Sequence, residues 1–169
     1  MAAVPALTPN LGLPRVDSTA HTMLWSHLNG IVDGVDGQFG RWQSYTPAWS
    51  QSDGAALYIG VGGTIEGRYL QLGKTVFASI FMQRGEGTNQ GTTHWLWGLP
   101  PVTPRRYQLV NGSFAMVRNN VWYAGSVFPA SSVQVGAIVG DLGRVGGTVP
   151  VSQHAIGDWY SVEIRYEAA

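Results

Sequence analysis

The chain has 169 residues, of which ten are basic and ten acidic, so its formal net charge is zero. Charged residues make up 12% of the chain, compared with about 25% in ordinary soluble domains, and glycine is abundant. Without an excess of positive charge, the sequence lacks the electrostatic character of a nucleic-acid-binding protein. The absence of cysteine excludes disulfides and thiolate metal sites. The length fits one domain with a shorter appendage.

The first segment, residues 1–16, is predicted to be an extended arm. Three prolines, with Asn10-Leu11-Gly12 between them, prevent a helix. Apolar side chains such as Val4, Leu7 and Leu13 would be costly to expose to water, which favours a segment that docks on another subunit or protein. Simple disorder is the alternative. The arm has no basic n-region and is rich in proline, so we expect neither a signal peptide nor insertion into a membrane.

A short helix is predicted within residues 17–41, capped by Asp17 or Ser18 and running to about Asp36. Its glycines each cost about 1 kcal/mol relative to alanine, so the helix needs contacts from outside itself. We expect these contacts to come from copies of the same chain, as in a coiled coil. A helix packed on its own β-domain is the alternative. The residues predicted to form the oligomer recur at steps of three and four and lie on one stripe: Leu24, Leu28, Ile31, Val35 and Phe39.

The remaining residues, 42–169, are predicted to form a β-sandwich or jelly-roll head of about eight or nine strands, which makes the chain mainly β. Alternation of apolar and polar residues is clearest over residues 160–166. Tight turns are expected at Gly73-Lys74, Asn111-Gly112 and Asn119-Asn120. The other predicted strands cover residues 64–72, 75–83, 107–110, 113–118, 121–128, 133–139 and 148–151.

The glycine-rich segment Arg84–Thr93 is predicted to be a long exposed loop, which is the usual place for recognition on a rigid sandwich. Aromatic side chains near loops can contact sugars or proteins, although most are expected to fill the core. Trp97, Trp122 and Trp159 are assigned to the core. The candidate contact residues are Arg84, Glu86, Asn89, Trp95 and Tyr123.

Sequence patterns for catalysis and for metal binding are weak. Gly73-Lys74-Thr75 lacks the glycine spacing of a phosphate-binding loop, and a hairpin turn explains it better. His21 on the helical stripe could face a three-fold axis and bind an ion, but a packed or solvated histidine is favoured over a metal site. The carboxylates are spread along the chain, and no nucleophile elbow is present. We therefore expect no catalytic residue, no metal and no cofactor.

Two stretches of the sequence resemble a specific class of protein. Residues 7–14 (LTPNLGLP), followed by 25–33 (WSHLNGIVD), are similar to the attachment segment of bacteriophage tail fibres and minor tail proteins. A second set is similar to the small β-rich head domains of virion proteins from actinobacterial phages. That set comprises Tyr45-Thr46-Pro47-Ala48-Trp49, residues 64–69 (TIEGRY), Gly73-Lys74-Thr75-Val76 and Leu99-Pro100.

The resemblance implies a non-enzymatic, homotrimeric virion protein that is assembled in the host cytoplasm. It would contact the host surface through its head and other virion proteins of the tail tip, baseplate or capsid through its arm. The implied attachment residues are Leu7, Pro9, Leu11, Leu13 and Pro14. A glycan of the host envelope is a further partner class. A capsid decoration protein or head spike is the main alternative, and a carbohydrate-binding or polysaccharide-degrading protein is the third.

Overall fold

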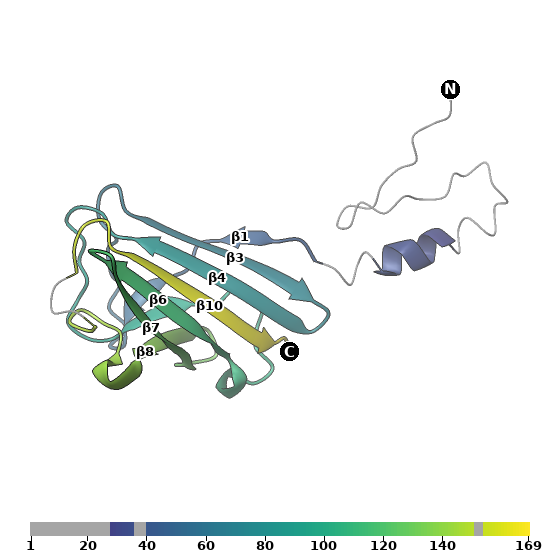
Figure 1. Cartoon of the computed structure of the whole chain (residues 1–169). Coiled ribbons are helices and arrows are strands. Elements are labelled where there is room, and N and C mark those ends of the chain that lie inside the picture. Colours follow the sequence, from purple (N-terminus) through teal and green to yellow (C-terminus); the bar gives the residue numbers. More distant parts are fainter. Residues whose placement is uncertain (1–27, 36–39, 151–153) are drawn as a thin grey trace, which may run out of the picture. The chain divides into compact units, whose positions relative to one another are not determined.

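The computed structural model describes residues 28–35, 40–150 and 154–169 (Figure 1). The chain divides into two compact units, of which one comprises Met1–Trp42 with Gln71–Gly73 and the other Gln43–Leu70 with Lys74–Ala169. The first contains the described helix and the second contains the β head. None of the helices in the described ranges is long and apolar enough to cross a membrane.

Residues 28–35 form a helix of two turns. Three of the side chains predicted to form the oligomer, Leu28, Ile31 and Val35, share one face of it, because three- and four-residue steps follow the helical repeat. All three are exposed, and Ile31 keeps 63% of its surface accessible. The predicted helix start, the oligomer residues Leu24 and Phe39, and the proposed attachment residues all lie outside the described residues.

The head is one curled antiparallel sheet, which confirms the predicted mainly β fold with a sandwich-like or barrel-like head. Its strand order is β1-β3-β4-β10-β6-β7-β8-β5-β2, with β9 paired to β8. Figure 1 shows the long strands β3, β4, β10 and β6 side by side. The strands are β1 (Gln43–Tyr45), β2 (Trp49–Gln51), β3 (Thr64–Leu72), β4 (Thr75–Gln83), β5 (Trp95–Gly98), β6 (Asn111–Arg118), β7 (Val121–Pro129), β8 (Gln134–Val139), β9 (Gly143–Arg144) and β10 (Trp159–Glu167).

The two ends of the strand order, β1 and β2, are consecutive in the sequence and only three residues apart, so the sheet must curl back on itself. One side-chain hydrogen bond joins β1 to the other end of the sheet: the hydroxyl of Tyr45 donates to the carbonyl of Gly98, at the end of β5, at 3.4 Å. The Gly98 amide in turn donates to the carbonyl of Ala48 at 2.8 Å, which extends the pairing of β5 with β2.

The core lies inside the curled sheet because alternate residues of each long strand point inward. Val76, Ala78, Ile80 and Met82 are the inward residues of β4, and all four are buried. Aromatic contacts join β5 to the strands that face it: Trp95 lies 5.4 Å from Tyr160, and Trp97 lies 6.0 Å from Phe114, between ring centroids. Trp97 is therefore a core residue, as predicted.

The hairpin between β6 and β7 forms as expected, since Asn119 and Asn120 both have positive φ, at 49° and 61°. Other predicted boundaries are wrong. Tyr107–Leu109 is a short 3-10 helix, and Asn111-Gly112 begins β6 and is not a turn. Residues 148–150 form no strand, and Val149 makes only an isolated bridge with Gly146.

Candidate functional site

A row of three aromatic side chains lies on the outer face of the head. It consists of Phe81 on β4, Trp159 on β10 and Trp122 on β7, and we call it the aromatic row. The Trp122 and Trp159 rings meet edge to face with centroids 5.1 Å apart, and the Phe81 ring lies 6.4 Å from Trp159. Trp122 is 67% exposed and Phe81 40% exposed, while Trp159 is half-buried between them. The sequence assignment of Trp122 and Trp159 to the core is therefore wrong.

Strand register explains how these residues come together. Trp159 pairs with Val117 of β6, and Val117 pairs with Trp122 of β7, so the three share one row and one face of the sheet. The two indoles lie on either side of Val117 in this register. Phe81 pairs with Ser161, two residues along β10 from Trp159, and so takes the diagonal position beside it. Four neighbouring strands of a rigid sheet thus fix the row.

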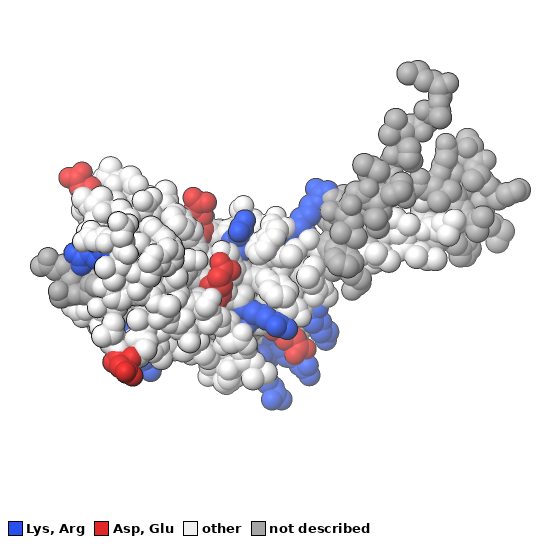
Figure 2. Space-filling model, viewed as in Figure 1, with Lys and Arg blue, Asp and Glu red and all other residues white. Residues whose placement is uncertain are grey.

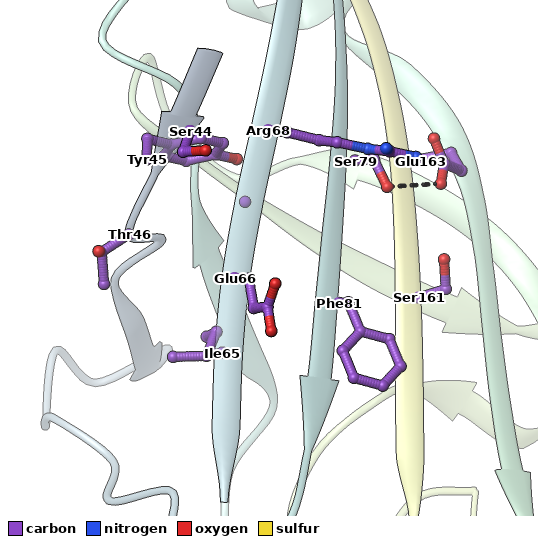
Figure 3. Close-up of a pocket in the computed structure, with 11 residues that line it drawn as sticks. Ser44, Tyr45, Thr46, Ile65, Glu66, Arg68, Ser79, Phe81, Ser161 and Glu163 are labelled. Atoms are coloured by element: carbon purple, nitrogen blue, oxygen red, sulfur yellow. Dashed lines mark hydrogen bonds between the residues drawn. The ribbon is translucent and has the colours of Figure 1, made fainter. Parts of the chain in front are cut away.

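A shallow groove of about 730 Å³ adjoins the aromatic row on the same outer face (Figure 3). Phe81 lines the groove and also contacts Trp159, so the two features share one side chain. The Ser79 hydroxyl donates a hydrogen bond of 2.8 Å to Glu163. Figure 3 shows the Arg68 side chain extending across β4 toward Ser79 and Glu163. The lining residues include Ser44, Thr46, Glu66, Arg68, Ser79, Phe81, Ser161 and Glu163.

The groove carries little net charge. Glu66, Arg68 and Glu163 are its charged lining residues, and all three are exposed outward positions of their strands. Over much of the face of the head seen in Figure 2 the charged groups are isolated on uncharged surface, and groups of both signs gather at its lower right. The groove therefore offers hydroxyl, carboxylate and guanidinium groups for hydrogen bonding, without a strong field of either sign.

The contact loop predicted from the sequence is held to the rest of the head by hydrogen bonds. Two isolated bridges join it to the preceding segment, between Val61 and Glu86 and between Tyr58 and Asn89. The Thr88 hydroxyl donates to the carbonyl of Ile59 at 2.6 Å. Glu86 and Asn89 are exposed, but their backbone is fixed by these pairings. The segment is therefore fixed to the rest of the head by backbone pairing.

The other candidate contact residues point elsewhere. Arg84 is only 8% exposed, and Trp95 is fully buried, with its indole N–H donating to the carbonyl of Gln90 at 2.7 Å. Tyr123 is half-buried and packs against the core, because it follows Trp122 on β7 and so points to the opposite face. The five candidates do not form one exposed surface. The aromatic row is the surface that sequence reasoning missed.

A buried polar network lies on the inner side of the head. The Tyr160 hydroxyl lies 2.8 Å from Nδ1 of His154, and Nε2 of His154 lies 2.9 Å from the carbonyl of Gly146. Burial lowers the pKa of His154 to about 4 and raises the pKa of Asp158. Nε and one Nη of Arg84, also buried, have no hydrogen-bond partner within the described part of the chain. His154, Arg84 and Asp158 are all buried, so these polar groups lie within the packed head.

Among the described residues, no three histidine or carboxylate side chains are placed to hold a metal ion. The two glutamates of the groove lie on an open face, whereas a glycosidase acid is kept protonated by a water-poor setting. The exposed carboxylates, guanidinium and hydroxyls of the groove are groups that can form hydrogen bonds to a ligand.

Comparison with known proteins gives no relative. No family model, no curated protein and no solved structure matches the chain. The aromatic row and the groove are therefore the observations from which a function can be argued.

Proposed function

We propose that the protein is a non-enzymatic structural protein of a bacteriophage particle, a short trimeric fibre or minor tail protein whose β head adheres to the host surface. The observation that carries the adhesive role is the exposed aromatic row. Exposing three neighbouring aromatic rings to water on a sheet face is energetically unfavourable. Exposed apolar patches of this kind mark interaction surfaces. The placement of the row on four paired strands suits a rigid contact surface.

The described helix supports the oligomeric part of the proposal. Leu28, Ile31 and Val35 leave an apolar stripe exposed on a helix too short to be stable alone in water. Burial of this stripe against copies of the chain would stabilise the helix, and β-branched residues at two of the three positions are compatible with a trimer. The bacteriophage assignment itself rests on the sequence resemblance in residues 7–14, 25–33 and 45–100.

Adsorption competition tests the adhesive role. Purified full-length chain should reduce the adsorption to host cells of phage particles whose genome encodes this chain. The free protein would occupy the sites on the cell surface that the particles need. Trp122→Ala should compete at least ten-fold less well, whereas Tyr58→Ala, a substitution at an exposed aromatic residue outside the row, should compete as the unaltered chain does. Equal competition by all three proteins would refute the adhesive role of the row.

Immunogold labelling of the same particles tests the location. Label at the tail tip supports a fibre or minor tail protein, and label over the head supports capsid decoration. Truncation of residues 2–15 should remove the chain from particles, since this arm carries the proposed attachment residues. Unchanged incorporation of the truncated chain would disprove the docking function of the arm.

A further inference from the structure

The aromatic row and the groove make one continuous surface. Phe81 belongs to both, and Ser161, which pairs with Phe81, also lines the groove. The surface runs from β3 across β4 and β10 to β7 on the outer face of the sheet. Its aromatic part and its hydrogen-bonding part therefore lie within reach of a single ligand.

The polar part of this surface has the composition that recognises hydroxyl groups. The carboxylates of Glu66 and Glu163 accept hydrogen bonds, the Arg68 guanidinium donates them, and serine hydroxyls do both. Hydrogen bonds from a hydroxyl to an ionised group are stronger than those between neutral groups. The hydrogen bond between Ser79 and Glu163 already orients one carboxylate at the groove wall.

Charge decides between classes of polymer. Two carboxylates against one guanidinium give the groove no excess of positive charge, which polyanions such as nucleic acids or phosphate-linked polymers would need for binding. The aromatic part consists of three rings, of which Trp122 and Trp159 meet edge to face and Phe81 is tilted by 32° to Trp159, so ring faces of different orientation border the polar groove. Sugar rings present apolar C–H faces to such aromatic rings and hydroxyls at their edges.

We infer that this surface binds a neutral polysaccharide chain, with sugar rings stacked on Trp122, Trp159 and Phe81 and with hydroxyl groups bonded in the groove to Glu163, Glu66 and Arg68. Phe81 belongs to the aromatic row and also lines the groove, so one polymer chain can contact both parts of the surface. This inference rests on the proposed adhesive function of the same face and names the chemical class of its ligand.

Affinity electrophoresis of the full-length chain tests the inference. Native gels would contain, one at a time, laminarin, mixed-linkage β-glucan, dextran, mannan and arabinogalactan as soluble probes. We expect at least one polymer to retard the chain. Trp122→Ala and Trp159→Ala should each weaken that retardation at least ten-fold, and Glu163→Gln should weaken it several-fold. Tyr58→Ala is the matched control and should migrate as the unaltered chain does.

Trp122 is largely exposed, so its substitution tests binding without unfolding the head; circular dichroism of the variant should match that of the unaltered chain. Retardation by no polymer of the panel would overturn the inference. So would retardation that survives Trp122→Ala and Trp159→Ala. Self-association that disappears in Trp122→Ala would identify the row as an interface between copies and would also overturn it.

The experiment separates this inference from the proposed function. A chain that competes for adsorption and is found in particles, but is retarded by no polymer, retains the proposed function and loses the polysaccharide ligand. A chain that is retarded by a polymer but is absent from particles retains the ligand and loses the virion assignment.

Discussion

The hydroxyl of Tyr160 lies 2.8 Å from Nδ1 of His154, and both side chains are buried. Because the carbonyl of Gly146 can only accept, Nε2 of His154 must carry the proton that it donates there. Nδ1 of a neutral imidazole is then the acceptor for the Tyr160 hydroxyl. A doubly protonated ring would reverse this hydrogen bond, since the Tyr160 oxygen can also accept, and would place a charge in the buried network, near Arg84 and Arg118.

Stability should therefore depend on pH through His154. Burial lowers its pKa to about 4 in the folded chain, from 6.5 in the unfolded one. As the pH falls from about 6.5 to about 4, the unfolded chain takes up a proton that the folded chain does not, so the free energy of unfolding falls. The loss for this residue is on the order of 3–4 kcal/mol at most, since one pKa unit corresponds to about 1.4 kcal/mol. Above pH 6.5 the contribution is complete and constant.

Urea unfolding at a series of pH values measures this effect. The raised pKa of Asp158 acts in the opposite direction at acidic pH, because the folded chain then binds the proton more tightly than the unfolded one. His154→Gln should flatten the decline between pH 6.5 and pH 4. His94→Gln is the matched control and should change it less, because His94 is only half-buried. If the free energy of unfolding of His154→Gln still falls between pH 6.5 and pH 4 as it does in the unaltered chain, groups other than His154 cause the fall.

The two tryptophans of β5 should respond differently to replacement by phenylalanine. Both are fully buried, but the indole N–H of Trp95 donates to Gln90, whereas that of Trp97 has no acceptor among the described residues. Trp95→Phe therefore loses a hydrogen bond in addition to volume, and should cost about 1–3 kcal/mol more than Trp97→Phe. Chemical denaturation of the two variants gives the difference directly, and equal losses would contradict the hydrogen-bond assignment.

Two glycines allow the close packing of the sheet and should not tolerate a side chain. A Cβ on Gly112 would collide with the carbonyl oxygen of Glu163, and one on Gly125 with that of Ile138. Since both obstacles are backbone atoms, Gly112→Ala and Gly125→Ala should each lower the free energy of unfolding by about 2 kcal/mol or more. Ser113→Ala, at an exposed position next to Gly112, should stay within about 0.5 kcal/mol of the unaltered chain. Thermal unfolding monitored by circular dichroism would rank the variants.

The exposed helical stripe should determine the oligomeric state. We expect light scattering to give three copies for the full chain and one for Ile31→Asp, because a carboxylate at the most exposed position of the stripe would be buried without a partner. Gly30→Ala is the control, since a Cβ there meets nothing within 4 Å and alanine favours the helix. A folded monomer formed by the unaltered chain in dilute solution would contradict the oligomeric proposal.

The long strands could be predicted because two signals agree in them. Thr64–Leu72 and Thr75–Gln83 have the bounds expected from the sequence, since a Gly-Lys turn separates two runs of β-forming residues. The short strands β1, β2 and β9 have two or three residues each, too few for alternation to be visible. Their positions depend on closure of the sheet, which joins residues distant in the sequence.

The aromatic row was missed because hydrophobicity alone does not say which face of a strand a residue occupies. Trp159 has the same parity as Ser161, Glu163 and Arg165, which are the polar positions of β10, so the alternation already placed it outside. Trp122 lies on the same face of β7 as Ala124 and Ser126. These two residues are small and do not indicate whether that face is buried or exposed. Only the pairing of β6 with β7 and β10 brings the two indoles together.

Successive residues of β4 and β10 point to opposite faces of the sheet. Substitutions on the outer face of these strands therefore do not change the side chains that fill the core. Positions 79, 81, 159, 161 and 163 can change identity while Ile80, Met82, Tyr160 and Val162 keep the same neighbours. Substitutions confined to those five positions would alter the outer surface and leave the core packing of β4 and β10 unaltered.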